Sequence, residues 1–471
     1  MRTECNEKSY QFQRLANRAV VAGFDGGTIT SDGGALLLRE LEAKRQLIGQ
    51  FAQCFVDHRK PELIEHTVEE LVGQRVYGLA LGYEDLNDHD RLRQDPLLAV
   101  LVGKEDPTGQ DRQREQDRGK ALAGKSTLNR LELTPEGANA ESRYKKIVVD
   151  GEQVEEFFLK VFVQAQGNAP SELVLDFDAT DDPVHGEQEG RFFHGYYGHY
   201  CYLPLYVFCN GFVLCAQLRR SNIDASEGSV EVLERIVGYL RQVWPEVKII
   251  VRGDSGFARE ALMSWCESHQ VDYVLGLARN RRLEEALRGE LDQARQQWAK
   301  TGHAVRCFKD FRYQTRDSWS CERRVVGKAE YLDKGANPRF VVTSLSSQGW
   351  EAQKLYEQLY CARGEMENRI KEQQLDLFAD RTSAATMRAN QLRLWLSSVA
   401  YLLLHQLRCW ALKSTDYATA QCGTLRLRLL KIGAQVRISV RRVVVSLATG
   451  FPGEAIFQQA YAALQLLPGG D

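Results

Sequence analysis

The sequence lacks the cysteine and histidine spacings that usually hold zinc. Its eleven cysteines include no C-x-x-C pair, and its nine histidines form no H-x-x-x-H. Neither residue type therefore supports a zinc site. Cysteines scattered in this way are typical of a reducing compartment, where disulfides rarely form. We therefore expect a cytoplasmic protein without structural zinc.

A strong net charge is also missing. Lys plus Arg total 61 and Asp plus Glu total 63, which gives a formal charge of −2. A chain balanced in this way is not drawn as a whole to a polyanion such as DNA or to an anionic membrane surface. Any surface that binds nucleic acid must therefore be local.

No segment has the length and apolarity of an export signal or a membrane span. The start, MRTECNEKSY, is polar and lacks the apolar core of a signal peptide. The most apolar stretch, from Leu394 to Leu412, is interrupted by His405, Gln406 and Arg408 and is barely long enough to span a bilayer. We expect no membrane partner and read this stretch as a buried helix.

The first 125 residues indicate helices followed by a charged linker. A chain of 471 residues with 44% hydrophobic content exceeds one ordinary domain. A short apolar strand, VVAGFDGG, precedes a helix from about Gly34 to Gln53. Thr67 and Glu70 form a capping box that opens a second helix. Residues 104–125 are charged and nearly free of apolar side chains, as in a linker or mobile loop.

The middle of the chain alternates strands and helices. An apolar run from Leu173 to Asp178 is followed by two more, residues 202–209 and 212–218, separated by Asn210-Gly211. That dipeptide is a strong hairpin signal. Helices near 226–243 and 258–268 then alternate with strands at 247–251 and 273–277. The resulting order of three strands, helix, strand, helix, strand predicts an α/β protein with a ribonuclease-H-like mixed sheet core.

Between Leu277 and Leu355 this alternation stops. The segment holds a charged helix and short strands, which predicts a separate, partly β insertion subdomain. A helix from about Gln353 to Gln374 then closes the core. The predicted division is 1–103, an amino-terminal mainly helical domain; 104–125, the linker; 126–277, the first part of the core; 278–349, the insertion; 350–412, the closing helices; and 413–471, a basic carboxy-terminal region.

Three carboxylates, Asp178, Asp254 and Glu367, are candidate metal ligands. Asp178 and Asp254 each end a predicted strand, and an open sheet presents its ligands at that edge. Glu367 lies on the closing helix. Carboxylate oxygens suit Mg²⁺, and two such ions neutralise the entering and leaving oxygens when a phosphodiester is cut or joined. Because these residues lie far apart in the sequence, only tertiary folding can bring them together.

Other residues compete for these roles. Asp176 shares a strand face with Asp178 and is an alternative ligand. We expect Asp181 and Asp182 to be solvated acids of a turn. Asp254 could instead cap the helix that follows it. Glu365 competes with Glu367.

At these residues the sequence resembles the DDE transposases of bacterial insertion sequences, in the group marked by a Y-x2-R-x3-E-x6-K signature. Tyr360, Arg363 and Glu367 match that signature, whereas Gln374 stands at the Lys position. Lys371 is a candidate substitute. The first acid also matches, as Asp178-Ala179-Thr180, and so does the second, as Arg252-Gly253-Asp254. The resemblance covers about residues 20 to 447.

This resemblance implies a DNA transposase that cleaves at the ends of an insertion sequence and joins the 3′ ends to target DNA. It implies Asp178, Asp254 and Glu367 as catalytic ligands of two Mg²⁺ or Mn²⁺ ions. The partners would be the element's terminal inverted repeats, target DNA and a second copy of the chain in a homodimer, at the bacterial nucleoid, with the amino-terminal domain binding DNA. The alternatives are a nuclease without strand transfer and a catalytically inactive DNA-binding descendant.

Basic residues near the acids are candidates for DNA binding. The spacing of Tyr360, Arg363, Glu367, Lys371 and Gln374 predicts one stripe on an α-helix, so Tyr360, Arg363 and Lys371 would contact DNA beside the metals. Three arginines directly follow a core strand: Arg279, Arg281 and Arg282. Residues 417–453 contain six basic residues and no acid: Arg426, Arg428, Lys431, Arg437, Arg441 and Arg442.

Overall fold

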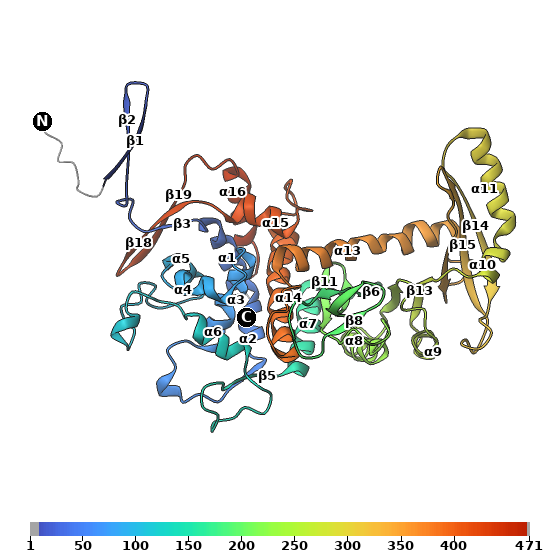
Figure 1. Cartoon of the computed structure of the whole chain (residues 1–471), viewed down its shortest axis with the longest axis horizontal. Coiled ribbons are helices and arrows are strands. Elements are labelled where there is room, and N and C mark those ends of the chain that lie inside the picture. Colours follow the sequence, from blue (N-terminus) through green and yellow to red (C-terminus); the bar gives the residue numbers. More distant parts are fainter. Residues whose placement is uncertain (1–8, 469–471) are drawn as a thin grey trace, which may run out of the picture.

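The protein, seen here as a computed structural model describing residues 9–468, is organised around one nine-stranded mixed sheet (Figure 1). Most of the polar start lies outside the described residues. Five strands form the core of the sheet: β6 (Glu172–Ala179), β10 (Leu205–Cys209), β11 (Phe212–Gln217), β12 (Lys248–Gly253) and β13 (Asp272–Leu277). The expected mixed α/β class is confirmed.

The core strands lie in the order β11-β10-β6-β12-β13. β10 is antiparallel to both β6 and β11, whereas β12 is parallel to β6 and β13 is parallel to β12. The parallel connections run through α8 (Ser229–Val243) and α9 (Glu260–Ser268). The expected succession of strands and helices is therefore confirmed. Because β6, β12 and β13 run in one direction, their carboxyl ends share one edge of the sheet.

The Asn210-Gly211 turn joins β10 to β11, as predicted. Asn210 has a φ of 50° and Gly211 a φ of 80°, the left-handed conformation of a two-residue hairpin turn. A Cβ added to Gly211 would lie 2.5 Å from Cε1 of His405 on α14 (Met387–Trp410). Glycine at this position therefore serves both the turn and the packing of α14 on the hairpin.

We expect Gly211→Ala to lower the free energy of unfolding by about 1–3 kcal/mol, because the side chain is strained at positive φ and also displaces His405. Gly238→Ala is the matched control. Gly238 lies on an exposed face of α8 with open space around it, so alanine there should raise stability by up to about 1 kcal/mol. Thermal unfolding of both variants measures the contrast, and equal effects would contradict this account of the turn.

The segment after β13 extends the central sheet, so the expectation of a separate subdomain is wrong. β17 (Arg339–Thr343) pairs antiparallel with β13, and β15 (Arg323–Leu332) and β14 (Val305–Tyr313) follow outward. β13 is the last strand of the five-stranded core, so its outer edge has backbone groups available for another strand. The apolar side chains of β17 are buried when it pairs there. The segment is partly β, as expected, with α10 (Arg281–Ala286) and α11 (Arg288–Thr301) beside the outer strands (Figure 1).

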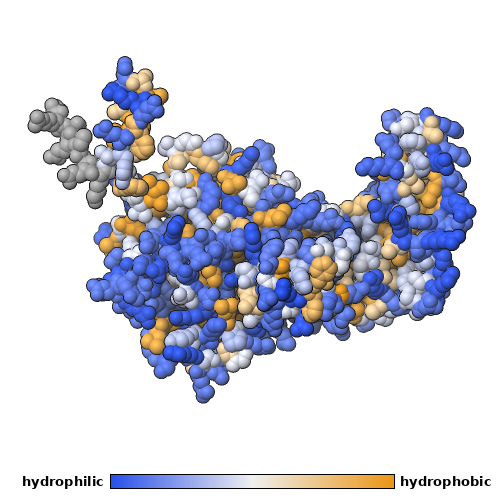
Figure 2. Space-filling view, viewed as in Figure 1, coloured by the Kyte–Doolittle hydropathy of each residue, from blue (hydrophilic) through white to orange (hydrophobic). Residues whose placement is uncertain are grey.

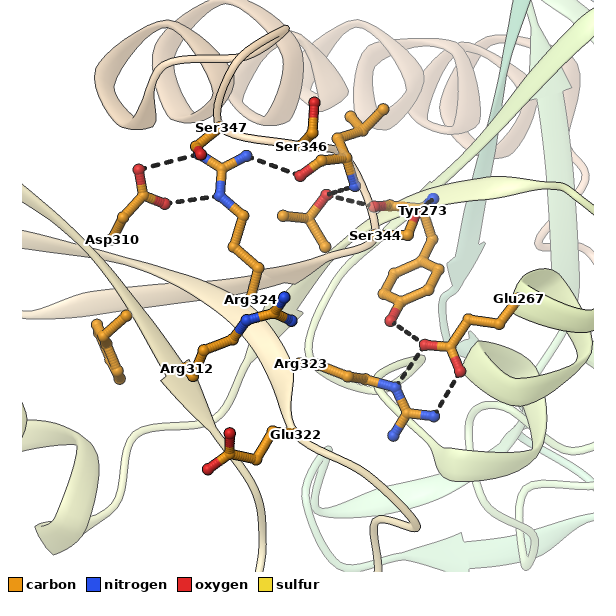
Figure 3. Close-up of a pocket in the computed structure, with 13 residues that line it drawn as sticks. Glu267, Tyr273, Asp310, Arg312, Glu322, Arg323, Arg324, Ser344, Ser346 and Ser347 are labelled. Carbon is orange, nitrogen blue, oxygen red and sulfur yellow. Dashed lines mark hydrogen bonds and ion pairs between the residues drawn. The ribbon is translucent and has the colours of Figure 1, made fainter.

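Ion pairs fasten these outer strands to the core. Figure 3 shows a pocket of about 530 Å³ at this junction, where Arg323 of β15 and Tyr273 of β13 both point at Glu267 of α9. Nε of Arg323 lies 2.6 Å from Glu267, and Arg324 binds Asp310 of β14 at 2.7 Å. These charges satisfy one another, so we assign the pocket a structural role.

The central helix α14 joins the sheet to the amino-terminal helices. It packs against β11 on one side and against α3 (Val68–Ala80) and α1 (Leu36–Arg45) on the other. The capping box of Thr67 and Glu70 opens α3, as predicted. One hydrophobic core includes residues of these helices and of the sheet. The predicted buried helix is confirmed, and within residues 9–468 no helix is long and apolar enough to cross a membrane.

Segments near the two ends of the described chain pack together. The short strand β3 (Ile29–Thr30) pairs with β18 (Ala434–Ser439), which pairs with β19 (Arg442–Leu447), and α16 (Glu454–Gln465) packs on α1. The predicted apolar strand near residue 20 is β2 (Arg18–Gly23). It forms an exposed hairpin with β1 (Ser9–Leu15) that projects from the body and carries apolar side chains (Figures 1 and 2).

The charged segment 104–125 is not a free linker. It is made mainly of turns, as expected, but Ala121, Leu122 and Ala123 are buried in the core. Arg112 is also buried and lies 3.0 Å from Glu65. The scarcity of apolar residues therefore predicted that the segment has no long helix or strand. It did not predict that residues 121–123 pack in the core.

Candidate active site

The pairing of β6 with β12 places Asp178 beside Asp254. In the parallel register Asp176 lies opposite Arg252 and Phe177 opposite Gly253, so Asp178 and Asp254 follow as neighbours at the carboxyl edge of the sheet. Each carboxylate is oriented locally. The backbone N–H of Ala179 donates to Asp178 at 3.1 Å, and that of Gly256 donates to Asp254 at 2.8 Å.

Asp176, the alternative ligand, is engaged by Arg252. The guanidinium donates to both carboxylate oxygens, at 2.5 and 2.8 Å, and both side chains are buried. Arg252 also donates to the carbonyl oxygen of Leu359, which precedes the signature residue Tyr360. The ion pair thus ties the two strands to the closing helix. It also favours Asp178 as the carboxylate free to bind a ligand.

Arg363 brings Glu367 to the strand-end acids. Glu367 lies on α13 (Gly364–Lys371), and its Oε1 is 2.6 Å from Nη2 of Arg363. Nη1 of the same arginine is 3.8 Å from Oδ1 of Asp178. The structure therefore brings together Asp178, Asp254, Arg363 and Glu367, from three elements distant in the sequence.

The environment raises the pKa of Asp178 to about 7. The largest cause is burial, which disfavours the charged carboxylate. Arg363 opposes this shift, whereas the negative charges of Asp254 and Glu367 add to it. The three acids are therefore close enough to repel one another. Additional positive charge at this place would relieve that repulsion.

The acids suit a divalent metal in chemistry, because hard carboxylate oxygens are the ligands of Mg²⁺ and Mn²⁺. As the described side chains stand, no group of three or more His, Cys, Asp or Glu residues is close enough to hold one ion. Arg363 lies among the acids and supplies positive charge there. The donor set fits the ion in its chemistry, and Arg363 now holds one oxygen of Glu367 at 2.6 Å.

Tyr360 packs directly against the strand ends. A Cβ added to Gly276 of β13 would lie 2.6 Å from the Tyr360 hydroxyl and 2.9 Å from the backbone nitrogen of Ser255. Burial and the nearby charge of Asp254 raise the pKa of Tyr360, although Arg363 opposes them. Glycine at 276 thus leaves room for the phenol beside the second acid.

The closing helix departs from regular α geometry on both sides of Glu367. Residues 352–376 form the expected helical run, but 355–360 and 372–376 are π-helical turns and 361–363 a 3-10 turn. The regular α spacing of the predicted stripe therefore holds from Glu367 to Lys371, but not between Tyr360 and Arg363 and not at Gln374. Such π turns occur frequently at functional sites. Lys371 is exposed on α13.

Gln374, at the signature's Lys position, binds Asp182. Its Nε2 donates to Oδ1 of Asp182 at 2.8 Å and to the carbonyl oxygen of Asp181 at 3.1 Å. Asp182 is fully buried, which raises its pKa to about 8. The expectation that Asp182 is a solvated turn acid is wrong, because Asp182 begins the short strand β7 (Asp182–Pro183), which pairs with β9 (His199–Tyr202), and its side chain is buried. Asp181 is half-buried and lies 2.8 Å from Nε2 of His199.

Sequence reasoning missed Tyr197 as a neighbour of the acids. Burial raises its pKa to about 12, and the charges of Asp181, Asp178 and Asp254 contribute. Tyr197 lies between β8 (Phe192–His194) and β9 (His199–Tyr202). The local concentration of aromatic residues after Asp178 was the only signal for it.

The other predicted DNA contacts fall into two groups. Arg279, Arg281 and Arg282 are exposed where β13 ends, at the edge that carries the acids. Among the six carboxy-terminal basic residues, Arg426 donates to carbonyl oxygens of α3 and Lys431 lies 2.6 Å from Asp32, so these two are structural. The remaining four are exposed: Arg428, Arg437, Arg441 and Arg442.

An acid pair on parallel strand ends, completed by a helix-borne glutamate, defines a candidate centre for metal-dependent phosphodiester chemistry. The family described as "Transposase DDE domain group 1" matches residues 12–469. The chain belongs to this family of DDE transposases. No curated protein matches the sequence. A solved structure, a piggyBac transposase synaptic complex with hairpin DNA, is similar at 12% identity and a TM-score of 0.39, over 85% of this chain and 80% of that one.

The raised pKa of Asp178 predicts how pH affects stability without metal. Its folded pKa exceeds the unfolded value of about 3.9, so ionisation destabilises the fold increasingly between about pH 4 and pH 7. Asp178→Asn cannot ionise. We subtract the free energy of unfolding of the wild type from that of the variant. This difference should be up to about 2 kcal/mol more favourable to the variant at about pH 8 than at about pH 5.5.

Asp176→Asn is the comparison variant. It leaves the buried Arg252 without its charge partner and should cost about 3 kcal/mol near neutral pH. Chemical unfolding in a chelating buffer measures both variants. A pH-independent effect of Asp178→Asn would contradict the raised pKa.

Proposed function

We propose that the protein is a DNA transposase that cleaves DNA at the ends of its element and joins the liberated 3′ ends to target DNA. The observation that carries the proposal is the register of β6 on β12, which sets Asp178 beside Asp254 within reach of the Arg363 and Glu367 pair. Membership of the DDE transposase family supports the same reaction class.

We assign Asp178, Asp254 and Glu367 as ligands of two Mg²⁺ or Mn²⁺ ions. Bound there, the ions would neutralise the charge on the entering and leaving oxygens of the phosphodiester. The chain itself holds the acids at the sheet edge, and the Asp176 and Arg252 pair keeps the two strands and the closing helix in place. A core of the ribonuclease-H type, proposed from the strand order β11-β10-β6-β12-β13, would supply this arrangement.

Cleavage and joining would differ only in the nucleophile. In cleavage a water oxygen attacks phosphorus and the 3′ oxygen leaves. In joining, the DNA 3′-hydroxyl attacks the phosphorus of a target phosphodiester, and the 3′ oxygen of the target strand leaves. A nuclease without strand transfer would use the same acids, so a joined product distinguishes the two functions. Two element ends must be held together for coordinated joining, and we therefore propose a homodimer.

Cationic side chains around the acids would hold the DNA backbone. We assign phosphate contacts to Arg363 and Lys371 on the closing helix, a contact beside the second acid to Tyr360, and further contacts to Arg279, Arg281 and Arg282. Phosphate contacts position the duplex rather than specify its sequence. In this assignment Arg363 has a double role, because it neutralises the acids before DNA and metal arrive.

We expect Asp178→Asn, Asp254→Asn and Glu367→Gln each to reduce cleavage and joining at least about 10²-fold, because each removes a charge that stabilises the transition state. Folding and DNA binding should persist. The matched control is Glu365→Gln, an exposed glutamate on the same helix. Gel assays of cleaved and joined products measure the effect, and near-normal joining by any of the three variants would remove that residue from the site.

Lys371→Ala should weaken DNA binding without changing the fold, since Lys371 is exposed. Losing one phosphate contact lowers the slope of log affinity against log salt by about 0.9. A salt series with a fluorescent duplex gives the slope. An unchanged slope would assign Lys371 to the solvated surface.

A further inference from the structure

A cavity of about 410 Å³ lies beside the first turn of α6 (Lys125–Glu132). Figure 1 places α6 among the amino-terminal helices. Its lining comes from the loop before α3, from α4 (His89–Leu92) and the residue after it, from the segment 104–125, from α6, and from the chain that follows α6. Three acidic side chains line it, against six basic ones: Arg59, Arg93, Arg112, Arg114, Arg130 and Lys146. None of these residues belongs to the candidate active site.

The three acids are already engaged. Glu65 lies 3.0 Å from Arg112, and Asp117 lies 3.5 Å from Arg93. Asp90 accepts from the backbone N–H of Lys125, at the start of α6, at 3.0 Å. Within the part of the chain that the structure describes, Arg114 and Arg130 have no acidic partner. The cavity therefore keeps an excess of positive charge.

Buried polar groups at the cavity lack hydrogen-bond partners. His66 is 5% exposed, and its Nε2 has no partner among the described residues. Nε of Arg93 and Nε of Arg112 are unpartnered in the same way. Buried donors are usually satisfied, by protein, water or a bound group. The pKa of His66 is lowered to about 3 by burial and by the nearby charges of Lys104 and Arg112, so the field at this place is positive.

The start of α6 suits an anion. Its N-cap is Gly124, which supplies no side chain to cap the helix. A Cβ there would lie 3.0 Å from both Nη1 of Arg93 and Oδ1 of Asp90, so glycine lets these groups approach the helix end. The N–H of Lys125 donates to Asp90 and that of Thr127 to the carbonyl oxygen of Gly124, so the attraction for a further anion at this end comes chiefly from the helix dipole.

An aromatic ring stands at the cavity. Tyr144 lines it and is more than half exposed, and the guanidinium of Arg130 lies over its ring at 5.1 Å from the centroid. An exposed ring beside arginines can stack on a base. The volume also exceeds what a single phosphate needs and lies in the range of sites that take small organic groups.

We propose that this cavity binds a phosphate group of a DNA strand, with the attached nucleoside against Tyr144. It would be a DNA contact separate from the acids at the sheet edge. The choice of DNA as the carrier of the phosphate rests on the proposed function. The positive charge, the unpartnered donors and the helix end do not depend on it.

The test compares Arg93→Gln and Arg130→Gln in the full chain with Arg118→Gln. Arg118 is an exposed arginine of the same segment that does not line the cavity, so it is a matched control. Each cavity variant should lower the salt slope of duplex binding by about 0.9, and the control should leave it unchanged. Because Arg130 is exposed, its variant keeps the test decisive if Arg93→Gln fails to fold.

Inorganic phosphate is the second probe. It should raise the thermal midpoint of the wild type, relative to chloride at equal ionic strength, and should do so less in the Arg93→Gln variant. Loss of this protection with an unchanged DNA slope would mean a free-phosphate site and overturn the DNA assignment. No effect on either readout would overturn the site itself. Neither readout needs cleavage, so failure of the proposed function would be seen separately.

Discussion

The parallel pairing of β6 with β12 is the constraint on which the site depends. It sets two charged pairs in succession along the strands, Asp176 opposite Arg252 and then Asp178 beside Asp254. The first pair is buried and satisfied, and the second sets two carboxylates side by side at the sheet edge, with Arg363 at 3.8 Å from Asp178. A register shift of one residue would turn all these side chains to the opposite faces of the sheet. By holding the register of the two strands, the ion pair of Arg252 and Asp176 also keeps Asp178 and Asp254 side by side.

Arg363 balances the charge that this register creates. Three neighbouring carboxylates with partial burial are unfavourable, and the raised pKa of Asp178 expresses that cost. A guanidinium that reaches both Asp178 and Glu367 lowers it. The irregular turns around α13 fit the same account, because they aim Arg363 and Glu367 at the strand ends while Gln374 turns toward the buried Asp182. The closing helix thus contacts Asp178 through Arg363 and Asp182 through Gln374.

The sequence predicted the elements whose signals are local. Asn210-Gly211 predicted a hairpin, and Thr67 with Glu70 predicted the start of a helix. The apolar runs before Asp178 and Asp254 predicted that both acids lie at strand ends. Three features depend on distant partners and could not be predicted in this way. β17 pairs with the edge of β13 although α10, α11, β14 and β15 lie between them in the sequence. Asp182 is buried where β7 pairs with β9. The closing helix has π turns where it packs on the core.

The proposed function depends on Asp178, Asp254 and Glu367 together forming one site for divalent metal ions. Calorimetric titration of Mn²⁺ into the metal-free protein at about pH 8, where Asp178 is ionised, tests it most directly. The account predicts that Asp178→Asn, Asp254→Asn and Glu367→Gln each weaken Mn²⁺ binding by at least about tenfold, whereas Glu365→Gln binds as wild type does. Equal Mn²⁺ affinity in all four variants and the wild type would contradict it.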